Sequence, residues 1–325
     1  MQKIVVFILS FVSIILFYFT FLSASKVFRT DWQLPETLAK AESDYRLVLI
    51  TQDLDTPFWV KVGEGALEQA QSEEASLEIW GSYGNNKEDF LKQIELAIYS
   101  QVDGIIVQGF DTDDFKNLTK IKAASYGIPV ITVANDVPMN ESLRRTYVGS
   151  DQYLAGQLIA KQLISDMGDK GEVILMFDRQ HQYYQEQRLE GIKDILSSFP
   201  HIEAIEAETS LTRESVNATT KDMLNKFPHV DAFIAVNANI SETMVLEIES
   251  RSQVEPYYIY SFDDDRESLS LLKEGKLDGI IEQSPHEMGK LSVSLITQWL
   301  KDEKEQLNLG GYFTDIKVVK AMDVR

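Results

Sequence analysis

The sequence contains no cysteine in its 325 residues. This absence excludes disulfide bonds, thiolate metal ligands and thiol nucleophiles, and it also excludes lipid attachment through an N-terminal cysteine. Histidine is scarce as well, and the four histidines (His181, His201, His229 and His286) are scattered without the spacing of metal ligands. We therefore expect no metal site of the zinc type and no cofactor bound through sulfur.

Positive charge is in short supply, because 51 acidic residues face 31 basic ones and the net charge is −20. A surface this acidic repels phosphate backbones, so we expect no nucleic-acid partner, and the acidity is typical of a well-solvated surface. The hydrophobic content of 44% and the charged content of 25% are those of a folded globular protein, and the length suits two domains.

Motifs of catalysis and phosphate binding are missing too. No Gly-rich phosphate loop follows a predicted strand, and the G-x-S-x-G pattern of a nucleophile elbow is absent. The acidic runs 111–114 and 263–265 lack the twelve-residue calcium loop with its closing glutamate, and for 111–114 we expect acidic helix N-caps. We find no catalytic constellation and predict that the chain is not an enzyme.

The N-terminus carries one long apolar run. Residues 4–22 hold no charged side chain, and a helix of that length spans about 30 Å, the thickness of a bilayer core. Length favours an uncleaved anchor, while Ser23-Ala24-Ser25 keeps a cleaved signal peptide open. We predict an anchor or signal segment at 1–25, a polar stalk at 26–44, and an extracytoplasmic remainder on a single-pass membrane protein.

From Arg46 onward, short β-rich runs alternate with stretches of helical period, which predicts parallel sheets with helices on both faces. The predicted strands are 46–51, 77–80, 104–108, 129–134, 172–177, 203–207, 231–236, 257–262 and 278–282. The predicted helices are 58–73, 87–101, 114–126, 151–166, 185–198, 213–226, 241–251, 266–274 and 286–301. The pattern occurs twice, which indicates two similar α/β lobes.

The carboxyl ends of the predicted strands carry amides, carboxylates and aromatics, and ligands of open α/β sheets bind at that edge. These residues are Asp53, Asp55, Phe58, Trp59, Gln108, Phe110, Asp111, Asn135, Asp136, Asp178, Arg179, the segment 183–188, Asn237, Asn239, Asp263, Glu282, Gln283 and Ser284. Amides and carboxylates bond hydroxyls, and aromatic faces pack on the C–H face of a sugar ring, so the set suits a small neutral polyol. We place Arg188 on the first turn of its helix, where a cation is disfavoured and needs a specific partner.

Eight motifs, in order, resemble the type I periplasmic binding proteins for sugars, the ribose-binding-protein-like group, over Arg46 to Val324. They are Pro57-Phe58-Trp59, Gly104-Ile105-Ile106-Val107, Gly127-Ile128-Pro129-Val130-Ile131-Thr132, Val148-Gly149-Ser150-Asp151 with Ala155-Gly156, Arg188-Leu189-Glu190-Gly191, Ala235-Val236-Asn237, Ser261-Phe262-Asp263, and Ile281-Glu282-Gln283-Ser284-Pro285. The resemblance implies an α/β fold of two Rossmann-like lobes joined by a three-segment hinge, here preceded by one transmembrane helix. It implies a first lobe of 45–150 plus 284–313 and a second of 151–283 plus 314–325, with crossings near Ser150, Gln283 and 313–315.

The resemblance also implies a ligand site in the cleft between the lobes. Phe58 and Trp59 resemble the stacking pair, with Asp55 and Thr56 as adjacent polar contacts. The resemblance and the strand ends together predict the ligand-binding set Asp55, Thr56, Phe58, Trp59, Phe110, Asn135, Asp136, Arg188, Asn237, Asp263 and Gln283. At 133–136 the chain reads Val-Ala-Asn-Asp where the family often has Asp-Arg, so one first-lobe cation is missing and a pentose, a hexose and another small polyol all stay open.

The partner is predicted from the N-terminus. Importer-linked binding proteins of Gram-positive cells resemble lipoproteins with a lipid-bearing cysteine, whereas this chain resembles anchored binding proteins that present sugar to a membrane histidine kinase. We therefore expect a sensor histidine kinase of a two-component system as the partner, with the permease of an ABC sugar importer as the alternative. The effector domain of a transcription repressor is disfavoured, because residues 1–45 offer a membrane span where a DNA-binding motif would lie.

Overall fold

The computed structural model describes Tyr18 and residues 45–84, 86–251, 257–262, 266–301 and 306–323. Residues 44–325 form one compact unit. The predicted membrane segment and stalk lie outside the described residues, except for Tyr18. Among the described residues, no helix has the length and apolar character needed to cross a bilayer.

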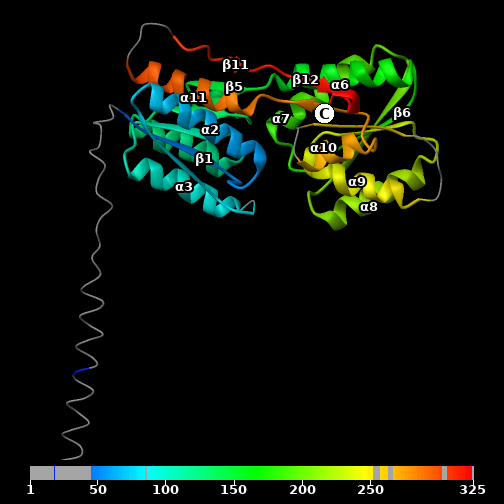
Figure 1. Cartoon of the computed structure of the whole chain (residues 1–325), viewed down its shortest axis with the longest axis horizontal. Helices are drawn as coiled ribbons and strands as arrows, with labels where there is room; N and C mark the ends of the chain where they lie inside the picture. The colour runs from blue at the N-terminus through cyan, green and yellow to red at the C-terminus, as the bar shows by residue number, and fades with distance from the viewer. Residues whose placement is uncertain are drawn as a thin grey trace, which may run out of the picture. The chain divides into compact units, whose positions relative to one another are not determined.

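Two six-stranded sheets organise the compact unit (Figure 1). The first has the order β11-β5-β4-β3-β1-β2, and the second has the order β12-β10-β9-β8-β6-β7. The first sheet consists of β1 (Arg46–Thr51), β2 (Ser76–Gly81), β3 (Gly104–Gln108), β4 (Val130–Val133), β5 (Thr146–Gly149) and β11 (Tyr312–Phe313). The second consists of β6 (Lys170–Asp178), β7 (His201–Thr209), β8 (Ala232–Ala235), β9 (Tyr258–Phe262), β10 (Gly279–Glu282) and β12 (Lys317–Val319).

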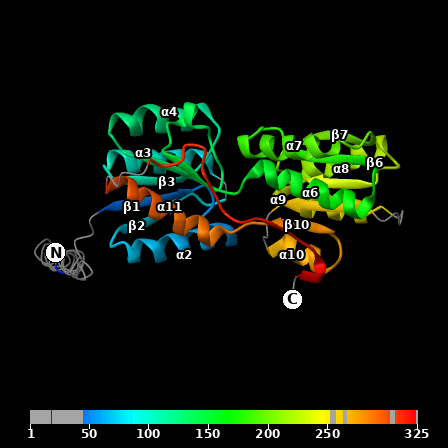
Figure 2. The ribbon, with the colours of Figure 1, turned by 90° about the horizontal axis from the view of Figure 1, so that it is seen from above.

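Helices cover both faces of each sheet (Figure 2). Those of the first lobe are α2 (Pro57–Ser72), α3 (Lys87–Tyr99), α4 (Asp113–Asn117), the π-helix η1 (Leu118–Ala123), α5 (Met139–Ser142) and α11 (Pro285–Leu300). Those of the second lobe are α6 (Gln152–Met167), α7 (Tyr183–Leu196), α8 (Arg213–Lys226), α9 (Ala238–Glu249), α10 (Arg266–Lys273) and the 3-10 turn η2 (Ala321–Asp323).

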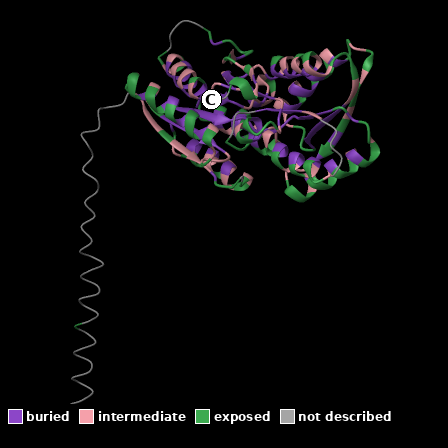
Figure 3. Cartoon of the chain, turned by 45° about the vertical axis from the view of Figure 1, so that its right-hand side comes forward, coloured by how far each residue is buried: buried purple, intermediate pink, exposed green. Residues whose placement is uncertain are grey.

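The central strands are apolar without interruption because both of their faces are covered. In β1, Leu47 and Leu49 join the cluster under α2 and α11, while Val48 and Ile50 join the cluster under α3. Figure 3 shows the result: the central strands are buried, and the exposed residues lie on the outer sides of the helices and on the edge strand β7. The core therefore sits in two layers per lobe, and the strand ends carry the polar residues.

Each lobe contains one pair of helices in close contact through glycine. In the first lobe, a Cβ on Gly65 of α2 would overlap the carbonyl oxygen of His286 on α11. In the second lobe, a Cβ on Gly156 of α6 would overlap the carbonyl oxygen of Arg188 on α7. No side chain larger than hydrogen fits at either position, so the two lobes share one packing device.

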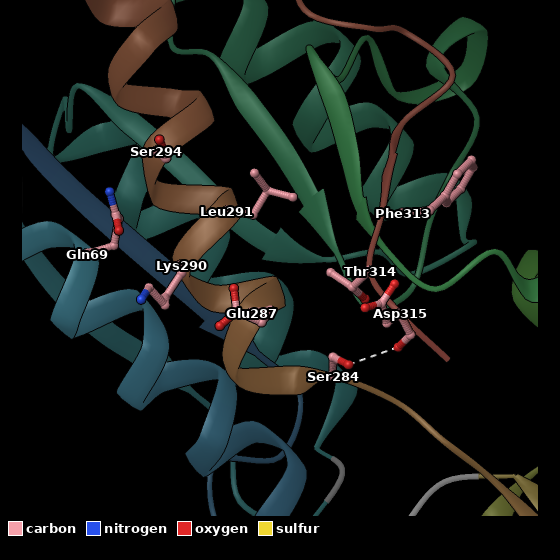
Figure 4. A pocket seen from close by; sticks show the side chains of 9 residues that line it. All are labelled: Gln69, Ser284, Glu287, Lys290, Leu291, Ser294, Phe313, Thr314 and Asp315. Atoms are coloured by element: carbon pink, nitrogen blue, oxygen red, sulfur yellow. Dashed lines mark hydrogen bonds between the residues drawn. The ribbon is translucent and has the colours of Figure 1, made fainter. Parts of the chain in front are cut away.

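The chain passes between the sheets after β5, after β10 and between β11 and β12. Two side-chain bonds tie these crossings together. The Ser150 hydroxyl donates to the amide oxygen of Gln283 at 2.6 Å, and the Ser284 hydroxyl donates to the Asp315 carbonyl at 2.8 Å. Figure 4 shows the second bond beside a surface groove between α11 and the third crossing. The crossings thus form one cross-linked hinge.

Every strand predicted from the pattern is present, with ends shifted by a few residues. The sequence analysis missed β5, β11 and β12, which have two to four residues each. Strands this short carry too few residues for a period-two pattern, and they form because a neighbouring strand offers free backbone groups.

Candidate ligand-binding site

Two adjoining cavities lie where the carboxyl ends of the two sheets face each other, with volumes of about 450 and 290 Å³. We call them together the cleft. Both are lined from both lobes. They share Thr56, Trp59, Gln108, Asn135, Tyr184, Asn237 and Asn239. Gln283 at the hinge lines the smaller cavity, which places that cavity at the hinge end of the cleft.

The loop after β1 brings two aromatic rings to the first-lobe wall. Thr56 caps α2 by accepting a bond from the Trp59 amide, and Pro57 begins the helix with its fixed φ. Phe58 and Trp59 therefore fall in the first turn, with their rings edge to face at 5.4 Å. Trp59 is 9% exposed, because it packs into the core under α2 while its remaining surface lines both cavities.

Asn135 is turned into the cleft by a strained backbone residue. Ala134 has φ +64°, a left-handed conformation that costs a non-glycine residue about 1–3 kcal/mol. The Tyr147 hydroxyl donates to the Ala134 carbonyl at 2.9 Å, and the Gly109 amide donates to the Asn135 carbonyl at 2.9 Å. These bonds hold the turn in place, so the side chain of Asn135 lines both cavities.

Gln108 and Phe110 follow β3 into the same wall. The Gln108 amide oxygen accepts from the Thr51 hydroxyl at 3.1 Å and from the Gln52 amide at 2.9 Å. Since both donors hold the oxygen, the amide nitrogen is turned away from them and remains a donor. Phe110 is 4% exposed and packs edge to face on Phe90, and it lines the larger cavity.

Arg188 anchors the second-lobe wall. It is 2% exposed, donates from Nε to the Gln152 amide oxygen at 2.7 Å, and donates from Nη1 to the Val236 carbonyl at 2.9 Å. Its guanidinium also stacks on the Phe262 ring at 4.2 Å. Because α7 begins at Tyr183, Arg188 lies in the second turn, and our placement of it in the first turn was wrong. The Gln152 amide oxygen, the Val236 carbonyl and the Phe262 ring help to position this cation.

Asn237 supplies the second amide of this wall. Its side-chain oxygen accepts from the Asn239 amide and caps α9, while its side-chain nitrogen donates to the Tyr184 hydroxyl at 2.9 Å. The Tyr184 ring in turn lies 5.1 Å from the Arg188 guanidinium. Asp178, at the end of β6, is 3% exposed, and burial raises the pKa of its carboxyl.

Eight predicted residues therefore line the cleft: Thr56, Phe58, Trp59, Phe110, Asn135, Arg188, Asn237 and Gln283. Asp55 is exposed and lines neither cavity. Asp136 also lines neither, and here the prediction is corrected. Its carboxylate forms an internal ion pair with Arg144, at 2.6 and 2.7 Å, and also accepts from the Thr132 hydroxyl at 2.6 Å, so it is bonded within its own lobe. Asp263 lies outside the described residues.

Lys87, Gln180 and Gln182 line the larger cavity but were not predicted. Tyr184 and Gln185 also line it; they lie in the segment 183–188 that was named at a strand end, but neither was included in the predicted ligand-binding set. Lys87 follows β2 at the start of a helix, so the rule of polar strand ends could have found it. At 111–114 the helix cap is Thr112 in place of an acidic residue. Within the described ranges, no three His, Asp or Glu side chains are arranged to hold a metal ion.

Comparison with known proteins defines the class of this molecule. Residues 47–304 match the family model described as periplasmic binding protein domain. The chain belongs to the periplasmic binding protein family, and its two sheets linked by three crossings have the architecture of the type I members.

Particular relatives sharpen the comparison. The ribose import binding protein RbsB of Salmonella typhimurium is 22% identical over 86% of this chain and 92% of its own length. The structure of GanP, a glucose-galactose binding protein from Geobacillus stearothermophilus, is 27% identical with a TM-score of 0.79, over 86% of this chain and 98% of that one. A chain of the XylFII-LytSN complex is 25% identical with a TM-score of 0.74, over 86% of this chain and 99% of that one.

Proposed function

We propose that the chain binds one small neutral sugar in the cleft and that binding closes the two lobes on it. The proposal depends on one observation: the two lobes present different side chains to the cleft. The first lobe presents the Phe58 and Trp59 rings, and the second presents the Asn237 amide and the Arg188 guanidinium. A sugar ring has an apolar C–H face and an edge of hydroxyls, so each wall meets a matching side of it.

Burial makes the polar contacts selective. Asn237, Arg188 and Gln283 are each less than one-tenth exposed. An apolar ligand would displace water from such polar side chains without offering a hydrogen bond in exchange, which costs about 1–3 kcal/mol per group. The proposed ligand is therefore a polyol that satisfies several of them together, and an apolar ligand of the same size is rejected. The names of RbsB and GanP support the same substrate class.

In this role the protein does no chemistry, and its output is the closed arrangement of the lobes. A ligand that contacts both walls binds the closed state better than the open one and shifts the population toward it. A partner that recognises the closed arrangement can then read the presence of the sugar. The cross-linked hinge at Ser150 and Gln283 is the part of the fold that would bend.

We propose a membrane histidine kinase as that partner, with the chain tethered outside the cytoplasm by its N-terminal apolar segment. The similarity to a chain of the XylFII-LytSN complex supports association with a second protein, because that relative is itself part of a complex. The absence of cysteine supports a tether other than a lipid. The second candidate is the binding component of an ABC sugar importer, which the import names of the curated relatives favour.

Thermal unfolding of the full-length chain with D-ribose, D-glucose, D-galactose, D-xylose and L-arabinose tests the ligand class. A sugar present at 100 times its Kd stabilises the folded state by about 2.7 kcal/mol, a rise in Tm of about 5 °C for a chain of this size. The Asn135→Ala variant should lose the response, while Lys92→Met, an exposed change on α3, should keep it. No shift with any polyol would reject the proposal.

The partner is tested in cells that lack this chain. If it serves a sensor, deletion abolishes sugar-induced transcription and leaves direct uptake of labelled sugar intact in cells where the importer is expressed constitutively. If it serves an importer, uptake itself falls. The two outcomes separate the two candidates even when neither partner protein has been identified.

A further inference from the structure

Lys87 lines the larger cavity from an unfavourable position. It is the first residue of α3, and the positive end of the helix dipole disfavours a cation there by about 0.3–1 kcal/mol. Glu88 and Asp89, the acidic residues that suit a helix start, follow it directly. A lysine in this position needs interactions that offset the dipole, and the structure places them across the cleft.

The Lys87 ammonium contacts one residue in each lobe. It lies 5.3 Å from the centre of the Phe110 ring in the first lobe and donates to the amide oxygen of Gln180 in the second lobe at 2.6 Å. Among the described first-lobe residues that line the cavities, Lys87 is the one cation. The structure therefore supplies, from α3, a first-lobe cation that the sequence lacks at 133–136.

A second bridge lies beside the first. The Asp111 backbone amide in the first lobe donates to the amide oxygen of Gln182 in the second lobe at 3.0 Å. Lys87, Gln180 and Gln182 all line the larger cavity and are absent from the smaller one, which contains the hinge residue Gln283. Both bridges therefore cross the cleft at the end away from the hinge.

Both sides of these bridges are held in place before they meet. On the first lobe, Asn86 caps α3 by accepting from the Asp89 amide, and Phe90 packs on Phe110. On the second lobe, the turn after β6 is closed by a bond from the His181 amide to the Asp178 carbonyl at 3.2 Å. These bonds fix the backbone on either side, so the entropy lost when the bridges form is mainly that of the Lys87, Gln180 and Gln182 side chains.

We propose that the Lys87–Gln180 and Asp111–Gln182 bridges form a latch that holds the cleft closed. The inference rests on the proposed function, because it describes how the same cleft is kept closed.

Linkage predicts the size of the effect. When the competent closed state is a minor population, the apparent Kd is the intrinsic Kd divided by the closed fraction. A latch variant that lowers the closed fraction tenfold therefore weakens sugar binding about tenfold through closure alone. That fold-change corresponds to about 1.4 kcal/mol.

The test uses isothermal titration of the full-length chain with D-ribose, D-glucose and D-galactose. Lys87→Met keeps the aliphatic chain and removes the donor. We expect it to weaken binding of whichever of these sugars the wild type binds by about tenfold. Lys92→Met makes the same change further along α3, on an exposed side chain, and should bind as the wild type does.

A double-mutant cycle with Gln180→Leu assigns the effect to the bridge. Once Lys87→Met is present, the second change should add little, since both remove one interaction. Additive losses, or wild-type affinity in Lys87→Met, would overturn the latch while leaving the proposed function standing.

Closure can also be measured without any sugar. Because the chain has no cysteine, spin labels on Asp114→Cys and Glu214→Cys, exposed residues of opposite lobes, report the inter-lobe distance without background. We expect a smaller short-distance population in Lys87→Met than in the unmodified background. Equal populations would reject the latch. If no sugar binds the wild type, the proposed function fails, and this measurement still decides whether the latch exists.

Discussion

The two lobes share a topology and a glycine-mediated helix pair, yet they present different walls to the cleft. The first-lobe wall presents the rings of Phe58, Trp59 and Phe110 beside two amides, whereas the second-lobe wall presents Asn237 and Arg188 beside one ring. The proposed sugar would contact both walls, so we expect ligand binding and lobe closure to be one event.

The buried arginines show the same contrast. Arg144 in the first lobe is 4% exposed and forms a bidentate ion pair with Asp136, which neutralises it inside the lobe. Arg188 in the second lobe is 2% exposed and donates to an amide oxygen and a backbone carbonyl while it lines the smaller cavity. The first arginine joins two segments of its own lobe, and the second lies on the wall of the cleft.

Removal of the aromatic wall should have the largest effect. Trp59→Ala should abolish sugar binding and also cost about 3–5 kcal/mol of folding free energy, because Trp59 packs into the core as well as the cleft. Titration calorimetry and urea unfolding measure the two losses. Trp299→Ala, at a half-exposed tryptophan outside the cleft, should leave the affinity unchanged. If Trp59→Ala still binds the sugar, Trp59 is not part of the ligand-binding wall.

The internal ion pair of the first lobe should affect stability alone. Asp136→Asn leaves the Arg144 guanidinium buried without its carboxylate and should cost about 3 kcal/mol, seen as a lower urea midpoint. The folded fraction should bind sugar within about twofold of the wild type. Glu141→Gln, in an exposed pair with Lys116, should cost less than about 1 kcal/mol. A large loss of sugar affinity in Asp136→Asn would show that Asp136 does belong to the ligand-binding site.

The polar wall of the second lobe is tested at a helix cap. Asn237→Ala removes the cap of α9, for about 1 kcal/mol, and removes a buried hydrogen-bonding group of the cleft. We expect the sugar affinity to fall by at least about tenfold. The matched control is Thr212→Ala, which removes the cap of α8 in the same lobe without touching the cleft. If both variants change the affinity equally, the effect belongs to the helix caps.

The smallest expected effect is a pH dependence in the second lobe. Burial raises the pKa of Asp166, but bonds from Lys320 and Tyr260 outweigh it and hold that pKa below its ordinary value. The carboxylate therefore stabilises the fold above the unfolded pKa of about 3.9, and this contribution is lost as the pH falls through the lower folded value. Asp166→Asn should flatten that part of the Tm-against-pH curve.

The control for this measurement is Asp222→Asn, at an exposed carboxylate on α8 paired with Lys226. It should leave the acid limb of the curve as in the wild type. An identical acid limb in Asp166→Asn and the wild type would show that the bond to Lys320 does not stabilise the C-terminal segment.

Much of the site followed from strand ends, and its failures have identifiable causes. Asn135 and Asn237 were found because polar residues directly after a buried strand lie at the edge where parallel sheets bind ligands. Asp136 occupies the same kind of position, but Arg144, eight residues away along the chain, captures it. No local pattern distinguishes an acid that faces a cleft from one that faces an arginine.

A second prediction failed because a cation was placed at the wrong position in its helix. A cation at a helix start needs a compensating partner, and we applied this rule to Arg188, which the structure places in the second turn. The rule does apply to Lys87, the first residue of α3, whose partner Gln180 lies in the other lobe. The dipole rule holds, but the predicted start of α7 was two residues too late. Helix boundaries depend on caps and tertiary contacts, which a sequence pattern does not contain.

The order of strands and helices, the uninterrupted apolar strands and the polar residues at their ends were determined by the sequence alone, because side-chain period and turn chemistry are local. The pairing of Asp136 with Arg144, the sharing of Trp59 between core and cleft, and the meeting of Lys87 with Gln180 were decided only by the tertiary structure. Each of these depends on which distant side chain arrives within bonding distance, and that is set by the packing of whole elements.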